Sequence, residues 1–126
     1  MEPTRTPKLA PYLAVRDAAG LVRFIEQGIG GQLTYRETSS EGNVQHAEVR
    51  VEDAVVVIGA SPPGRPLFPA MLHLYVTDAD RGYHRALQAG ATSVREPTDA
   101  ADGDRRGGVR DAWGNAWWFT RARAGH

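Results

Sequence analysis

The chain has 126 residues, a net charge of zero from 15 basic and 15 acidic side chains, and no cysteine. This length predicts one domain, the balanced charge argues against a nucleic-acid partner, and the lack of cysteine excludes disulfides, thiolate zinc sites and cysteine nucleophiles. No apolar run reaches the ~18 residues that a membrane helix needs, and residues 1–8 lack the apolar stretch of a signal peptide, so we expect a cytoplasmic protein with no membrane partner.

The first half of the chain has the pattern of a strand, a helix and three more strands. A short apolar strand at 13–15 leads to Asp17, whose carboxylate can cap the helix that follows. Apolar residues recur at helical spacing up to Gly30, where a Gly-Gly pair ends the helix. Three strands are expected after it, at 33–38, 44–51 and 54–60.

A proline-rich segment at 62–69 interrupts the chain near its middle. Proline lacks the amide donor that a helix interior or a central strand requires, so we interpret this segment as a linker. Within a single domain of 1–126, it separates a first module of about 9–61 from a second module of about 70–122.

The second half repeats the order of elements found in the first. A strand at 71–76 is followed by a helix from Asp78 to Ala89, and Gly90 ends that helix. Further strands are expected near 92–95, 108–111 and 116–121.

The two halves also match in sequence. Residues 12–17 correspond to 73–78 at an offset of 61, and residues 54–58 correspond to 115–119 at the same offset. We therefore predict an α+β fold in which two tandem βαβββ modules form a cupped mixed sheet. Both helices are expected on its outer face, which leaves the concave face free for a site.

The order and spacing of these segments resemble the vicinal oxygen chelate superfamily, the group of glyoxalases, bleomycin-resistance proteins and extradiol dioxygenases. Residues 11–18 look like its opening strand and helix cap. Other segments are similar to its uncharacterised PhnB-like branch, at 46–56, 72–80, 89–91 and 103–117. The resemblance covers residues 9–121 and implies a homodimer. It does not select one activity, because this fold hosts both enzymes and non-catalytic drug-binding proteins.

Metal enzymes of this superfamily take His, Glu or Gln ligands from equivalent strands of the two halves. The resemblance projects those ligand positions onto Ala10, Val57, Met71 and Trp118. None of these side chains suits a hard or borderline divalent cation. We therefore expect no metal and no other cofactor.

Three other polar residues leave an alternative open. His46 and Glu48 share one face of their strand with Arg50, and His73 lies on the first strand of the second half. Two histidines and a glutamate could hold a divalent cation in a non-standard arrangement, or Glu48 or a histidine could act as a general base. A simpler explanation of these three residues is that they form hydrogen bonds in the lining of the cup, or that they lie on a solvated edge strand.

Trp118 is the most informative residue of the expected concave face. Strand alternation sends Trp117 into the core and Trp118 to the opposite face, where an indole offers a flat stacking surface. The expected pocket is apolar and is formed by Trp118, Tyr12, Tyr75, Met71 and Val57, with His46, Glu48 and His73 orienting polar groups. The alternative is that Trp118 fills the cup and leaves no pocket.

Arg105 and Arg106 lie with Asp104 in a glycine-rich segment, 103–108, that we expect to be a loop. Such a loop could close over the cup so that Arg105 meets an anionic group of a ligand. It could equally be a solvated turn.

The sequence favours a metal-free protein that binds a small, partly aromatic molecule, and sequestration of a compound such as an antibiotic is the most concrete form of this hypothesis. The principal alternative is a metal-dependent lyase, isomerase or dioxygenase with non-standard ligands. Metal-free proton transfer, or a domain with a closed cup that associates with other proteins, remains open as well.

Overall fold

The computed structural model describes residues 9–123. The chain divides into two compact units, with the boundary between Phe68 and Pro69. In the part of the chain that is described, no helix is long and apolar enough to cross a membrane.

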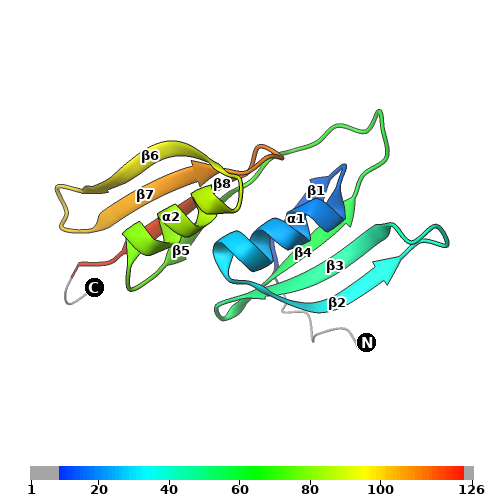
Figure 1. Ribbon diagram of the computed structural model, residues 1–126, viewed down its shortest axis with the longest axis horizontal. Coiled ribbons are helices and arrows are strands. Elements are labelled where there is room, and N and C mark those ends of the chain that lie inside the picture. Colours follow the sequence, from blue (N-terminus) through cyan, green and yellow to red (C-terminus); the bar gives the residue numbers. More distant parts are fainter. Residues whose placement is uncertain (1–8, 124–126) are drawn as a thin grey trace. The chain divides into compact units, whose positions relative to one another are not determined.

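The first unit is a four-stranded mixed sheet with a helix on one face (Figure 1). Its elements are β1 (Tyr12–Val15), α1 (Ala18–Phe24), the π-helical turn η1 (Ile25–Ile29), β2 (Gln32–Thr38), β3 (Val44–Val51) and β4 (Ala54–Ala60). The strand order is β1-β4-β3-β2, and only the β1–β4 pair is parallel. Helix α1 packs on β1, β3 and β4.

The second unit has the same construction. Its elements are β5 (Met71–Tyr75), α2 (Ala79–Gln88), β6 (Thr92–Asp99), β7 (Arg105–Arg110) and β8 (Ala116–Arg121). The strand order is β5-β8-β7-β6, with β5 and β8 parallel. Helix α2 packs on β6, β7 and β8, so within the described part of this unit the opposite face of the sheet is not covered by its own helix. The predicted α+β fold with two βαβββ modules is confirmed.

The strand pairing follows the internal repeat that the sequence shows. Tyr12 pairs with Val57 in the first unit, and His73 pairs with Trp118 in the second. Both residues of the second pair lie 61 positions after their counterparts, which is the offset found in the sequence. The helix caps correspond too, because Asp17 accepts a hydrogen bond from the amide of Gly20 and Asp78 accepts one from the amide of Arg81.

The second unit differs from the expectation in one segment. Strand β6 extends past Arg95 to Asp99, and β7 already begins at Arg105, so the glycine-rich segment is mostly strand rather than loop. Pro97 is tolerated because β6 is an edge strand and its pairing with β7 is irregular between Arg95 and Thr98. The expected loop at 103–108 is therefore wrong, and the connecting turn lies at 100–104.

Trp117 anchors the core of the second unit beneath α2. Its side chain is fully buried, as predicted. Phe119, two residues further along β8, is buried on the same face of the strand. Gly82 lets α2 approach closely, because a Cβ atom at this position would lie 2.6 Å from the Phe119 ring. The indole Nε1 of Trp117 donates a hydrogen bond of 2.9 Å to the carboxylate of Asp111.

Asp111 organises the turn that leads into β8. One carboxylate oxygen accepts hydrogen bonds from the amides of Trp113 and Asn115, both at 2.9 Å. The other oxygen accepts from the side chains of Asn115 and Trp117. Asp111 is buried, so water cannot easily take the place of its carboxylate as the acceptor for these donors.

We expect Asp111→Ala to lower the free energy of unfolding by roughly 3 kcal/mol, because it leaves several buried donors without an acceptor. Urea denaturation of the purified protein measures this change. The matched control is Asp53→Ala in the corresponding turn of the first unit, where the side chain is exposed, and its expected effect is within about 0.5 kcal/mol. Equal losses in the two variants would contradict the role given to Asp111.

Candidate functional site

A row of four residues, one from each strand, crosses the helix-free face of the second sheet. His73 on β5 pairs with Trp118 on β8, and Trp118 pairs with Gly108 on β7. Gly108 pairs in turn with Arg95 on β6. Cross-strand pairing therefore gathers residues that lie far apart in the sequence.

The indole of Trp118 lies flat over Gly108. A Cβ atom added to Gly108 would lie 2.8, 2.9 and 2.9 Å from three carbon atoms of the indole. Because these distances are nearly equal, the plane of the indole runs parallel to the strand surface, and any side chain at position 108 would displace it. Glycine is therefore what allows Trp118 to present one flat face away from the sheet.

His73 extends this flat surface on the other side of Trp118. The two rings are nearly parallel, with an interplanar angle of 16° and centroids 6.1 Å apart. His73 is exposed and Trp118 is half-buried, so both rings are accessible. We call this pair the aromatic platform.

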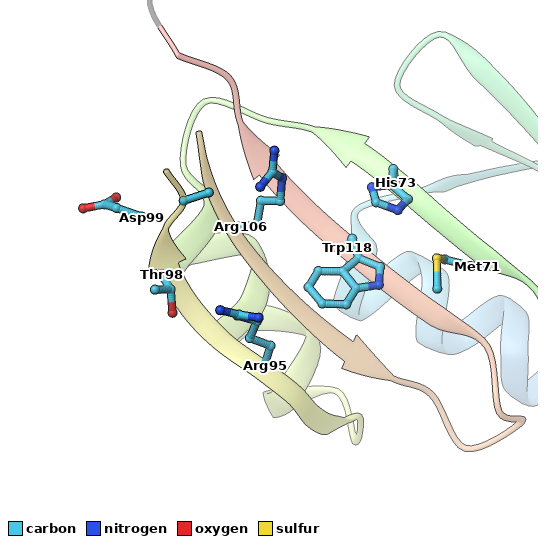
Figure 2. A pocket seen from close by; sticks show the side chains of 8 residues that line it. Met71, His73, Arg95, Thr98, Asp99, Arg106 and Trp118 are labelled. Atoms are coloured by element: carbon cyan, nitrogen blue, oxygen red, sulfur yellow. The ribbon is translucent and has the colours of Figure 1, made fainter. Parts of the chain in front are cut away.

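The aromatic platform lines a hollow of about 350 Å³ (Figure 2). The hollow is lined by Met71, His73, Arg95, Thr98, Asp99, Ala100, Arg106 and Trp118. Three of these residues, Met71, His73 and Trp118, are among the site residues predicted from the sequence. The platform and Met71 make one side apolar, while two arginines supply charge on the other.

The charge of Arg106 is compensated by two aspartates of the adjoining turn. Its Nη2 donates to Asp102 at 2.6 Å and to Asp104 at 3.1 Å. The hydrogen bond to Asp102 raises the pKa of Arg106, and the pKa of Asp102 is lowered by the backbone amide of Asp104 and then by Arg106. Asp104 is buried and also accepts from the backbone amide of Arg123, which ties this turn to the end of β8.

Arg95 is the arginine of this hollow whose charge is not compensated. Over residues 9–123 its side chain has neither a hydrogen bond nor an ion pair. Asp99 does not supply one, because it accepts from Arg105 at 3.1 Å and its side chain points away from the hollow (Figure 2).

Arg105 lies on the opposite face of β7 from Arg106, next to the helix. Its Nε and Nη2 donate to the two carboxylate oxygens of Asp80 on α2, at 2.7 and 3.1 Å. This bidentate contact raises the pKa of Arg105 and lowers the pKa of Asp80. Arg105 thus joins helix to sheet and does not line the hollow. Because the sequence predicts a loop around Arg105 and Arg106, where strand alternation does not apply, it does not predict that Arg106 is the one that faces the hollow. It does not single out Arg95, because an arginine in a predicted strand carries no local signal of a binding role.

Four of the remaining predicted residues, Tyr12, Val57, Glu48 and His46, lie on the helix-free face of the first sheet. Tyr12, Val57 and Glu48 form a row there, equivalent to the row through Trp118. Tyr12 is 60% exposed, and its hydroxyl covers Gly59, where a Cβ atom would collide with it. Tyr75 belongs to the second sheet, where it pairs with Thr120 one step beyond the platform.

Glu48 and His46 are close neighbours in the first unit. The distance from His46 Nε2 to Glu48 Oε2 is 3.7 Å. Glu48 is only 5% exposed, and its Oε1 has no hydrogen-bond partner among the described residues. Tyr35 lies at the edge of the His46 ring and donates a hydrogen bond of 2.6 Å to Glu37, which raises the pKa of Tyr35.

The residues at the projected ligand positions do not fit a metal ion. Ala10 and Val57 carry no donor atom, and the indole nitrogen of Trp118 is a hydrogen-bond donor only. In either unit, over the described residues, no three His, Cys, Asp or Glu side chains gather into a group that could hold a metal.

Comparisons with known proteins agree with this architecture. The sequence pattern of the Glyoxalase/Bleomycin resistance protein/Dioxygenase superfamily matches residues 8–119. The uncharacterised protein Mb0911c of Mycobacterium bovis is 34% identical over 122 residues, covering 88% of this chain and 80% of that protein.

The solved structures that are similar to the chain include the following two. TioX from Micromonospora sp. ML1 is similar with a TM-score of 0.79 at 26% identity, covering 91% of this chain and 98% of that one. A gene product from Arabidopsis thaliana has a TM-score of 0.74 at 24% identity, with the same coverage, and at this identity it supports the fold alone.

We expect Gly108→Ala to lift the indole of Trp118 off the strand, which costs about 1–3 kcal/mol of stability and shifts tryptophan emission to longer wavelength. Steady-state fluorescence measures the shift, and Arg110→Ala, on the same face of β7, is the control without it. Trp113 and Trp117 also emit, so the measurement is repeated with Trp118→Phe in the background. If Gly108→Ala still shifts the emission in the Trp118→Phe background, the shift does not come from the indole of Trp118.

Proposed function

Because the chain belongs to the Glyoxalase/Bleomycin resistance protein/Dioxygenase superfamily, we propose that it binds a small, partly aromatic molecule on the aromatic platform without a metal. The observation that carries this proposal is the indole of Trp118, laid flat over Gly108 in a hollow of about 350 Å³. Sequestration of such a compound, as in resistance to an antibiotic, is the form of the function that we favour.

The platform offers a flat ligand a stacking surface. Offset stacking of aromatic rings contributes about 0.5–1.5 kcal/mol beyond the burial of apolar area. His73 adds a second, nearly parallel ring, so a ligand of two fused rings can contact both side chains. Met71, which is 66% exposed, supplies a flexible apolar side chain that adapts to the ligand's edge.

A metal-free enzyme is the second candidate, and Glu48 is the residue that favours it. A buried carboxylate with one oxygen lacking a partner, next to a histidine, has the composition of a general base. Such an enzyme needs a substrate proton within hydrogen-bond reach of Glu48. We place it second because the hollow lined by the platform does not include Glu48.

We expect Trp118→Ala to weaken binding of the neutral fluorescent probe N-phenyl-1-naphthylamine by at least tenfold, because the stacking surface is removed. Titration of the probe, followed by its emission, measures the dissociation constant. Trp113→Phe is the matched control, because Trp113 does not line the hollow. Unchanged affinity in Trp118→Ala would contradict the proposal, and so would stoichiometric metal in untagged protein purified without chelator and analysed by elemental analysis.

We also propose that the chain forms a homodimer. Large side chains are exposed on the helix-free sheet faces, with Tyr12 at 60%, Met71 at 66% and Tyr75 at 65%. These side chains lie on sheet faces that the unit's own helix does not cover, and a second copy of the chain can remove their apolar surface from water. We expect a mass twice the 13.7 kDa of one chain by light scattering coupled to size exclusion. A monomer at every concentration tested would contradict the dimer.

A further inference from the structure

We infer that the ligand of this site is an aromatic anion: a planar ring system that stacks on Trp118 and carries a carboxylate, sulfonate or phosphate bound by Arg95. This inference rests on the proposed function and adds the charge of the ligand to it. It depends on three observations, which are the free guanidinium of Arg95, the compensated charges of its neighbours, and the register that places Arg95 beside the platform.

The guanidinium of Arg95 has all its donors available. Its side chain is exposed on β6, lines the hollow, and makes no hydrogen bond or ion pair within residues 9–123. A guanidinium presents donors in a rigid planar fork that matches a carboxylate or a phosphate in a bidentate contact. Arg95 can therefore meet an anion without first giving up a protein partner.

The other charged residues that line the hollow are already occupied. Arg106 donates to two aspartates of the turn, and Asp99 accepts from Arg105. Asp99 also points away from the hollow (Figure 2). The uncompensated charge that a ligand meets there is consequently positive and belongs to Arg95.

Strand register brings this charge next to the stacking surface. Arg95 pairs with Gly108, and Gly108 is the residue on which the indole of Trp118 lies. Figure 2 shows Arg95 beside the benzene edge of the indole, on the side opposite His73. A single small molecule can thus stack on Trp118 and extend an anionic substituent towards Arg95.

Two probes with one shared skeleton test this inference. N-phenyl-1-naphthylamine is neutral, and 8-anilino-1-naphthalenesulfonate is the same ring system with a sulfonate. We expect the wild-type protein to bind the sulfonate about tenfold more tightly than the neutral probe, because a charge-assisted hydrogen bond is added. We expect this preference to shrink as salt is raised, since the contact is partly exposed.

Variants of Arg95 then locate the charge. Arg95→Gln is expected to bring the ratio of the two dissociation constants from about tenfold to near one, and Arg95→Lys is expected to retain part of the preference. Arg110→Gln is the matched control, because it removes the same charge from the same sheet outside the hollow. Circular dichroism and urea midpoints confirm that each variant is folded, which excludes probe binding to loosened protein.

Each outcome separates this inference from the proposed function. Equal affinity for the two probes, or a preference that survives in Arg95→Gln or is lost equally in Arg110→Gln, overturns the aromatic anion and leaves the stacking site standing. Failure of the wild-type protein to bind either probe overturns the proposed function and this inference with it.

Discussion

The site of this protein depends on the orientation of one strand, β8, which is held from the core side. The buried indole of Trp117 donates its only polar hydrogen to Asp111, and the same carboxylate organises the turn that leads into the strand. Since successive side chains of a strand point to opposite faces, burying Trp117 obliges Trp118 to face away from α2. The flat surface of the site is thus a consequence of how the core is anchored.

The two units show how one framework supports two different surfaces. The pair Val57 and Glu48 in the first unit occupies the positions of Trp118 and Gly108 in the second, as the equivalent strand pairings show. A glutamate next to a small valine leaves a buried carboxylate with one unpartnered oxygen. A glycine next to a tryptophan instead allows a ring to lie flat. The repeat therefore conserves the backbone arrangement while the side chains of the row decide the chemistry.

The sheet of the second unit also separates its arginines by function. Arg105 faces the helix and binds Asp80, whereas Arg106 faces the hollow and binds the aspartates of the turn. Both contacts are ion pairs that stabilise local structure. Arg95, on the irregular edge strand, is left without such a partner and is available to a ligand. Ion pairing within the fold thereby determines which charge the hollow presents.

The sequence by itself determined the features that depend on neighbours along the chain. These are the order of the elements, the aspartate caps of both helices, the repeat, and the opposite orientation of Trp117 and Trp118. Caps and strand alternation act over a few residues, so they can be recognised in a single sequence. Strand alternation places Met71, His73 and Tyr75 on one face of their strand and sets Trp118 opposite Trp117, whereas the superfamily resemblance is what places them in one cup.

Only the tertiary structure decided which strands lie side by side and in what register. The glycine-rich segment is paired strand, so Arg106 rather than Arg105 faces the hollow, and Gly108 lies beneath the indole. Arg95 lies on β6, and the pairing of β6 with β7 places it beside Gly108. The physical reason is that a shift of one residue in strand pairing reverses every side chain, and that register is set by contacts between residues distant in the sequence.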